Sequence, residues 1–99
     1  MIKHIESADQ FNKEIASGKV LVDFYATWCG PCQMLSPVIE QLDKEANIKI
    51  LKVDVDELSD IARVFRVMSI PTLVVLENGR MTKREMGYMP LERLKQLIS

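Results

Sequence analysis

The sequence predicts an α/β domain in which a mixed β-sheet is covered by helices on both faces. Strand-like and helix-like segments alternate over most of the chain, and an Asn-Gly pair then joins two strand-like segments ahead of a last helical one. Strands that alternate with helices usually pair in parallel, whereas two strands joined by a two-residue turn must pair antiparallel. Residues 1–99 are expected to form a single domain, because a chain this short has too little core to divide.

A short strand and a helix are predicted at the start of the chain. Ile2 and His4 lie in an alternating pattern that indicates the strand. Ser7 followed three residues later by Gln10 has the form of a capping box, which predicts that a helix begins there. Gly18 is expected to end this helix as a carboxyl cap, because glycine readily takes the left-handed conformation that such caps need.

A buried strand and a long helix follow. Val20–Ala26 is a run of apolar, β-branched and aromatic residues typical of a strand buried on both faces, and a single carboxylate, Asp23, interrupts it. Apolar residues then recur at helical spacing over Met34–Leu42. Pro37 lies inside this helix, where it removes one backbone donor and is expected to bend the helix without ending it.

The next two elements are a third buried strand and a short helix. Ile48–Val55 has the composition of the strand, and apolar residues at helical spacing over Leu58–Val67 indicate the helix. Asp56 or Ser59 is expected to cap it. The acidic residues here resemble the start of a calcium-binding loop but lack its glycine, so helix capping is the preferred interpretation.

A β-hairpin and a helix are predicted at the end of the chain. Thr72–Glu77 and Met81–Met86 read as strands, and the intervening Asn78 and Gly79 accept the positive φ angles of a tight hairpin turn. These strands are therefore antiparallel. Pro90 suits the start of the last helix, which presents leucines on one face.

The composition argues against two classes of partner. Thirteen Lys and Arg against fourteen Asp and Glu give a net charge of −1, without the basic surplus that nucleic acids require. The longest aliphatic run, Leu73–Leu76, is far shorter than the ~18 residues of a membrane span. The first ten residues carry charges and no apolar core, so a cytoplasmic location is expected.

The only two cysteines, Cys29 and Cys32, are separated by two residues between the buried strand and the long helix. Both sulfurs can therefore meet at the helix start, where a disulfide is sterically possible. The free N–H groups and the dipole of the helix favour a thiolate on Cys29 more than on Cys32. We expect Cys29 to be the exposed nucleophile of thiol–disulfide exchange and Cys32 to resolve the mixed disulfide.

A metal site is the main alternative for this pair. Zinc needs two further ligands, and the only histidine, His4, lies at the far end of the first strand, where we expect it to be solvated. No metal is therefore expected within one chain. A cluster shared by two copies of the chain stays open, because the sequence neither shows nor excludes it.

Three motifs occur together in this chain. Trp28–Cys32 (WCGPC) lies between the buried strand and the helix, Ile70–Thr72 (IPT) precedes the fourth strand, and Gly87 follows the fifth. Together they closely resemble the thioredoxin family, and the resemblance extends from Ile2 to Ser99.

This resemblance implies a thioredoxin fold, with a five-stranded mixed sheet and two helices on each face. It also implies a monomeric protein-disulfide reductase that binds no cofactor. Its partners would be disulfide-containing client proteins and a thioredoxin reductase, which supplies electrons from NADPH. A dithiol oxidase or isomerase, or a scaffold subunit that does no redox chemistry, are the alternatives.

The resemblance also assigns roles to individual residues. Cys29 would attack, Cys32 would resolve, and Asp23 would exchange a proton with Cys32. Lys52 on the neighbouring strand matches a lysine near that carboxylate, and the alternative is that Lys52 merely satisfies a buried Asp23. Pro71 matches a cis-proline that faces the cysteines. The implied client-docking surface consists of Trp28, Gly30, Pro31, Ile70, Pro71 and Gly87.

The chain departs from the common family pattern at Tyr25, Gln33 and Ser69, where Trp, a basic residue and Gly are frequent. Gln33 removes a positive charge beside the cysteines, which affects thiol acidity and the choice of clients. Three methionines, Met68, Met86 and Met89, are either core residues or part of the docking surface, and core filling is the preferred interpretation.

Overall fold

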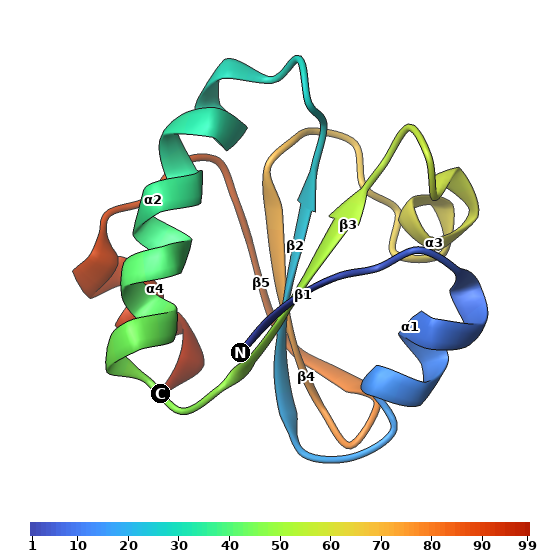
Figure 1. Ribbon diagram of the computed structural model, residues 1–99, viewed down its shortest axis with the longest axis horizontal. Coiled ribbons are helices and arrows are strands. Elements are labelled where there is room, and N and C mark those ends of the chain that lie inside the picture. The colour runs from blue at the N-terminus through green and yellow to red at the C-terminus, as the bar shows by residue number, and fades with distance from the viewer.

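Five strands form one sheet in the order β1-β3-β2-β4-β5 in the computed structural model, which describes residues 1–99 (Figure 1). β1 and β2 run parallel to β3, whereas β4 is antiparallel to both β2 and β5, so the predicted mixed sheet is confirmed. Along the chain the elements are β1 (Ile2–His4), α1 (Ala8–Glu14), β2 (Lys19–Tyr25), α2 (Gly30–Glu45), β3 (Lys49–Asp54), α3 (Ser59–Val64), β4 (Thr72–Glu77), β5 (Arg80–Met86) and α4 (Leu91–Ile98).

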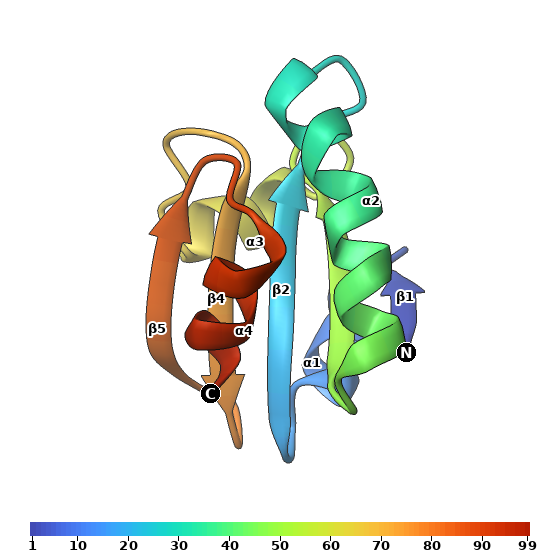
Figure 2. The same cartoon turned by 90° about the vertical axis from the view of Figure 1, so that its left-hand side faces the viewer.

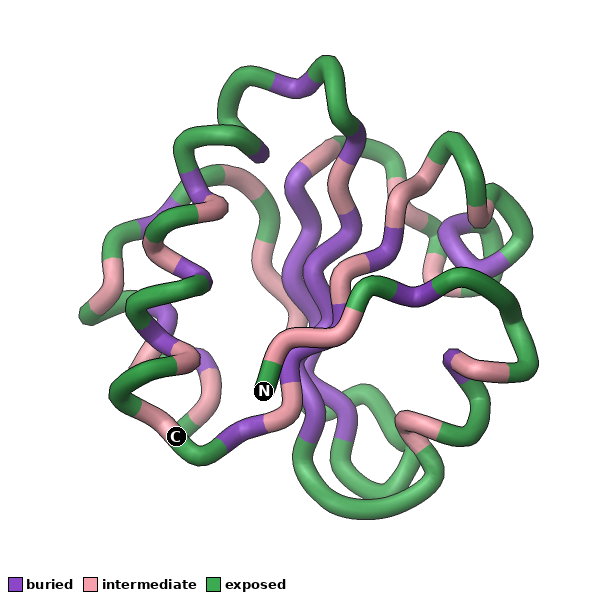
Figure 3. The backbone as a smooth tube through the Cα atoms, in the orientation of Figure 1, coloured by how far each residue is buried: buried purple, intermediate pink, exposed green.

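The helices cover both faces of this sheet. α1 and α3 lie on one side and α2 and α4 on the other (Figures 1 and 2). Each side has its own apolar cluster, in which Phe11 and Ile61 pack against one face of the strands and Leu35 and Leu94 against the other. The central strands are the most buried part of the chain (Figure 3). The apolar run in β2 therefore reflects burial on both faces, as its composition predicts.

Ser7 caps the start of α1 as predicted, although the Gln10 side chain reaches Glu6 rather than Ser7, and the helix ends earlier than predicted. Ser7 Oγ accepts the backbone N–H of Gln10 at 3.1 Å, and the Gln10 side chain accepts the N–H of Glu6 at 2.7 Å. The helix ends at Glu14, so the prediction that Gly18 caps it is wrong. Gly18 has φ +79° and donates its N–H to Asn78 Oδ1, which places it in the turn that enters β2.

The predicted caps of α3 are also wrong. The N-cap residue is Leu58, and no side chain caps the helix. Asp54 instead accepts the backbone N–H groups of Asp56 and Glu57, at 2.9 and 3.4 Å. An aspartate at the end of a strand can satisfy the next turn in this way, and the following helix then begins without a side-chain cap.

The pairing of β2 brings two loops to the same edge of the sheet. Tyr25 is opposite Asp54 at the carboxyl ends of β2 and β3, and Phe24 is opposite Thr72 at the amino end of β4. The loop that enters α2 and the loop that precedes β4 therefore meet there, at the top of Figure 1. α2 then continues unbroken through Pro37 for sixteen residues.

The hairpin between β4 and β5 provides a first prediction. Asn78 and Gly79 have φ values of +52° and +82°, as a two-residue turn requires. A Cβ on Gly79 would lie 3.7 Å from the nearest atom, an ordinary contact, so the cost of Gly79→Ala is that of the backbone conformation. We expect this variant to lose about 1 kcal/mol of unfolding free energy in denaturant titrations.

Gly30→Ala is the matched control for this substitution. Gly30 begins α2, has no atom near its Cβ position and does not have positive φ. Alanine there should leave stability unchanged or increase it slightly, because alanine favours helix. Equal losses in the two variants would show that backbone conformation at Gly79 does not determine the cost.

Candidate active site

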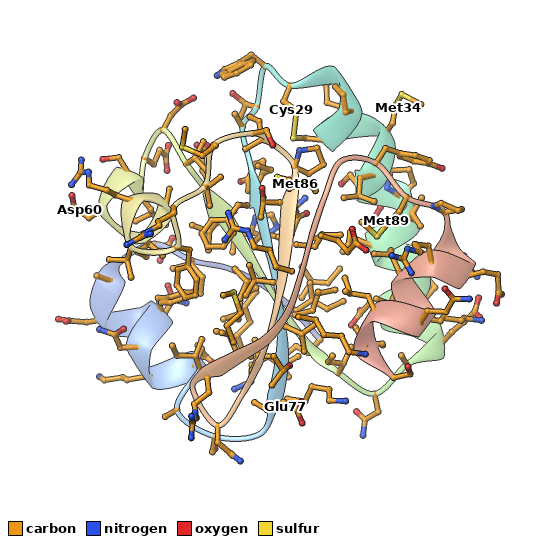
Figure 4. The ribbon with its side chains drawn as sticks, turned by 180° about the vertical axis from the view of Figure 1, so that it is seen from behind. Cys29, Met34, Asp60, Glu77, Met86 and Met89 are labelled. Atoms are coloured by element: carbon orange, nitrogen blue, oxygen red, sulfur yellow. A yellow bond between two sulfur atoms is a disulfide. The ribbon has the colours of Figure 1, made fainter.

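The two cysteines lie at the amino-terminal end of α2 and form a disulfide bond. Cys29 is the N-cap residue, and Cys32 lies in the first turn with its Cα atom 5.2 Å from that of Cys29. The backbone N–H of Cys32 donates to Cys29 Sγ at 3.2 Å. Figure 4 shows Cys29 where α2 begins. The predicted meeting of both sulfurs at the helix start is confirmed, and Cys29 receives the helix N–H group that favours a thiolate.

The expectation that Cys29 is the exposed cysteine is wrong for the disulfide form. Cys29 and Cys32 are 4% and 5% exposed, because Ala26 and the partly buried Ile70 and Val55 pack around them. The two sulfurs differ instead in their neighbours. Cys29 Sγ lies 3.7 Å from the carbonyl oxygen of Ile70, whereas Cys32 lines a hollow of about 370 Å³.

The loop before β4 is held beside the disulfide. The Ile70–Pro71 peptide bond is cis, which agrees with the family pattern. The Pro71 carbonyl accepts the N–H of Gly87 at 2.8 Å, and the Thr72 hydroxyl donates to the Ser69 carbonyl at 2.6 Å. These bonds connect the loop to the end of β5 and close it on itself, so the Ile70 carbonyl has a defined position next to Cys29.

The surface around the disulfide is largely apolar. Trp28 is 69% exposed, and its Nε1 donates to Asp56 Oδ2 at 2.8 Å, which fixes the indole. Gly30 and Pro31 are exposed as well, whereas Pro71 is buried. A hollow of about 200 Å³ lies beside the indole and is lined by Trp28, Val55, Val67, Met68, Ser69 and Ile70.

Two of the three methionines are not in the core. Met68 is 90% exposed and Met86 58% exposed, so core filling is wrong for both. Met89 is buried in the cluster beneath α2 and α4, where core filling is confirmed. Helical or strand periodicity does not resolve such cases, since methionine is common both in cores and on adaptable surfaces.

Asp23 is a buried carboxylate near the centre of the sheet. Its side chain is 2% exposed, its Oδ1 has no hydrogen-bond partner, and its Oδ2 lies 3.8 Å from Lys52 Nζ. Burial raises the pKa of Asp23 from its ordinary 3.8 to about 6, and the charge of Lys52 opposes that rise. The sequence-based pairing of Asp23 with Lys52 is confirmed as a contact between adjacent strands.

Lys52 connects this carboxylate to the hollow beside Cys32. Its ammonium donates to Ser36 Oγ at 3.4 Å and lies 4.6 Å from the centre of the Tyr25 ring. The walls of the hollow include Cys32, Ser36 and Lys52 but not Asp23. The sequence analysis missed Ser36. Its spacing of four residues from Cys32 was the available signal, because such residues share a helix face.

The three departures from the common family pattern each make a contact in this structure. Gln33 Nε2 donates to the Thr27 carbonyl at 2.9 Å, which ties the first turn of α2 to the preceding loop. Ser69 Oγ donates to Met86 Sδ at 3.2 Å. The Tyr25 ring lies under the Lys52 ammonium. Gln33 therefore borders the hollow that Cys32 lines and Tyr25 borders the Asp23–Lys52 pair, whereas the Ser69 hydroxyl contacts the end of β5.

No group of three or more His, Cys, Asp or Glu side chains is arranged to hold a metal ion. Asp54, the last residue of β3, instead accepts hydrogen bonds from the backbone, and Asp56 accepts one from Trp28. None of the four helices has the length and apolar character needed to cross a membrane.

Comparison with known proteins identifies the family. The family model named Thioredoxin matches residues 2–99. The chain belongs to the thioredoxin family. It is 46% identical over 98 residues to the thioredoxin of Bacillus subtilis (strain 168), with 96% of this chain and 94% of that protein covered. It is 45% identical over 101 residues to the thioredoxin of Listeria monocytogenes, with 100% and 97% covered.

Solved thioredoxin structures have the same fold. A mutant thioredoxin from Halobacterium salinarum NRC-1 superimposes with a TM-score of 0.91 at 36% identity, covering 98% of this chain and 87% of that one. Oxidised mitochondrial thioredoxin 3 from Saccharomyces cerevisiae gives 0.85 at 33% identity, covering 97% and 92%. The thioredoxin fold predicted from the sequence is confirmed.

Membership of the thioredoxin family, together with the Cys29–Cys32 pair at disulfide distance, establishes the reaction class. The protein is a thiol–disulfide oxidoreductase and a protein-disulfide reductase. Thioredoxins work through the cysteine couple without a bound cofactor, and as a family they interact with thioredoxin reductase and with disulfide-containing clients.

The raised pKa of Asp23 predicts that Asp23→Asn stabilises the protein above pH 6. Between about pH 4 and 6 the native state holds a proton that the unfolded state has lost, so native stability falls as pH rises through this interval. The amide of the Asp23→Asn variant does not titrate, so the variant does not lose stability over this pH interval. Denaturant titrations should show a gain of about 2–3 kcal/mol at pH 7–8 and little change below pH 4.

Asp60→Asn controls for the loss of one negative charge, because the Asp60 side chain is 88% exposed. Its stability should change by less than ~1 kcal/mol at any pH. If Asp23→Asn were instead less stable than the parent at pH 8, the attraction of Lys52 would outweigh the desolvation of Asp23.

Proposed function

We propose that Cys29 attacks the disulfide of a client protein and that Cys32 then releases the reduced client. The N-cap position of Cys29, next to the Ile70 carbonyl, carries this proposal, because the helix N–H groups stabilise a thiolate there. The Cys29 thiolate forms a mixed disulfide and expels one client thiolate. The Cys32 thiolate then attacks Cys29 Sγ and expels the other, so two electrons leave the dithiol as the Cys29–Cys32 disulfide forms.

Asp23 is the proton acceptor that makes the second step possible in this proposal. Cys32 must lose its proton before it attacks, and a carboxylate with a pKa of about 6 is ionised yet basic enough to accept a proton near neutral pH. Lys52 lies between Asp23 and the hollow that Cys32 lines. The alternative, that Lys52 simply satisfies Asp23, is weakened because Oδ1 has no partner and Oδ2 lies outside hydrogen-bond distance of the ammonium.

Clients dock on the apolar surface around the disulfide. The exposed Trp28 ring provides contact area at low entropic cost, because its bond to Asp56 already fixes it. The absence of side-chain bulk at Gly30 lets a client backbone approach. The proposed docking surface comprises Trp28, Gly30, Pro31, Ile70 and Gly87, with Pro71 supporting the loop from its buried position.

The electron donor is a thioredoxin reductase that uses NADPH, and the protein works as a monomer in the cytoplasm. Similarity to the thioredoxin family supports the choice of donor. Both cysteines belong to the redox couple, which leaves no separate structural disulfide and is typical of a reducing compartment. One chain also supplies the whole couple, so a second copy is not needed.

Cys32→Ser tests the order of attack. The variant should accumulate a mixed disulfide between Cys29 and an oxidised client protein, because no second thiol is available to resolve it. Non-reducing electrophoresis and peptide mass spectrometry would identify the linked cysteine. Cys29→Ser is the matched control and should trap little client. Equal trapping by the two variants would show that either cysteine attacks.

Asp23→Asn tests the proton acceptor. Reduction of an oxidised client by the dithiol should slow by about ten-fold or more near pH 7, since general-base catalysis typically contributes 10²–10⁴-fold. Stopped-flow fluorescence of Trp28 would follow the reaction. Stability and rate would then move in opposite directions in one variant. An unchanged rate at pH 7 would contradict the role of Asp23 and leave the cysteine chemistry intact.

A further inference from the structure

Three polar side chains lie in a row across the sheet beneath α2. His4 on β1 is the register partner of Lys52 on β3, and Lys52 is the register partner of Asp23 on β2. The residues two positions earlier on each strand belong to, or pack against, the apolar cluster beneath α2 and α4. Side chains two positions apart on a strand point to the same face of the sheet, so the row also faces α2. Lys52 is therefore placed between a buried carboxylate and the open edge of the sheet.

The Lys52 ammonium can lie in either of two places. On one side its ammonium lies 3.8 Å from Asp23 and borders the hollow that Cys32 lines. On the other side it borders a second hollow of about 230 Å³, whose walls also include His4 and Glu40. Water and the exposed Glu40 carboxylate both favour an ammonium there, because a lysine side chain is long and flexible and its charge is strongly hydrated.

Ser36 separates these two places. It lines both hollows, and it lies four residues after Cys32 and four before Glu40, which places all three on one face of α2. Its hydroxyl oxygen accepts a hydrogen bond from Lys52 Nζ at 3.4 Å, while the Tyr25 ring contacts the same ammonium. The lysine is thus held at a point from which it reaches Asp23.

We propose that Ser36 is a positioning residue that holds the Lys52 ammonium beside Asp23 and away from Glu40. Without the hydroxyl, the ammonium moves toward the second hollow, and Asp23 loses part of the only positive charge near it. Asp23 then binds its proton more tightly, so a larger fraction of it is already protonated near pH 6–7 and cannot accept the proton of Cys32. This inference rests on the proposed role of Asp23 in the release of the client.

Other titratable groups around the pair do not replace Lys52. The residue opposite Asp23 on β4 is the apolar Leu73. His4 lies on the far side of Lys52 from Asp23. None of the other titratable groups that border the pair is a cation; these groups are Tyr25, Cys32, Glu40 and Asp54. A shift in the proton affinity of Asp23 therefore reports the position of the Lys52 ammonium.

The test is the titration of the Asp23 carboxyl carbon by NMR in the oxidised protein, where the cysteines do not titrate. Ser36→Ala should raise the Asp23 pKa by about half a unit or more, because an opposite charge at 4–6 Å typically lowers it by 1–3 units. Ser36→Thr keeps the hydroxyl and should restore the parent value. Ser17→Ala, an exposed site between α1 and β2, is the control and should change nothing.

A second substitution identifies where the ammonium goes. Adding Glu40→Gln to Ser36→Ala removes the attracting carboxylate and should reverse part of the rise. An unchanged or lower Asp23 pKa in Ser36→Ala, or a Thr variant that behaves like the Ala variant, would overturn the proposal.

The pH dependence of client reduction separates this inference from the role of Asp23. In Ser36→Ala the acidic limb of the pH–rate profile should move to higher pH by the same amount as the Asp23 pKa. If the NMR titration shifts and the rate profile does not, Ser36 positions Lys52 as proposed, and the proton transfer assigned to Asp23 is what fails.

Discussion

The pairing of β2 with β3 on one side and with β4 on the other is the constraint on which the site depends. The register sets Tyr25 opposite Asp54 and Phe24 opposite Thr72, so the loop that carries the cysteines meets the loop that carries the cis-proline. The same pairing sets Lys52 beside Asp23. A shift of one residue would turn Asp23 to the other face of the sheet, away from α2 and Cys32.

This arrangement destabilises the protein at β2, the same strand that positions the site. β2 is buried on both faces, which gives the cysteine loop a well-packed base. A carboxylate in that strand is poorly solvated, and its unpaired Oδ1 shows that neighbouring groups do not fully compensate. The desolvation that lowers stability is also what moves the pKa of Asp23 toward neutrality. The lower stability and the near-neutral pKa of Asp23 are therefore two consequences of one burial.

Most of the architecture could be predicted from the sequence, because it depends on strong local signals. The helix cap at Ser7, the Asn-Gly turn and the WCGPC segment each specify a conformation within a few residues. The position of Gly18 in the turn before β2 could not be predicted, since its N–H bonds to Asn78, sixty residues later. The exposure of Cys29 and the contact of Ser36 with Lys52 likewise depend on packing between elements that are distant along the chain.

The two cysteines differ in what surrounds them more than in how far they are buried. Cys29 lies on the outer side, where the Ile70 carbonyl and the fixed Trp28 ring border the surface that a client would touch. Cys32 lies on the inner side and borders the hollow that leads to Lys52. Cys29 thus borders the loop that carries the cis-proline, whereas Cys32 borders the hollow that Lys52 also lines. Because both cysteines lie within a single helical turn, Cys32 Sγ can reach Cys29 Sγ and close the Cys29–Cys32 disulfide within the start of α2.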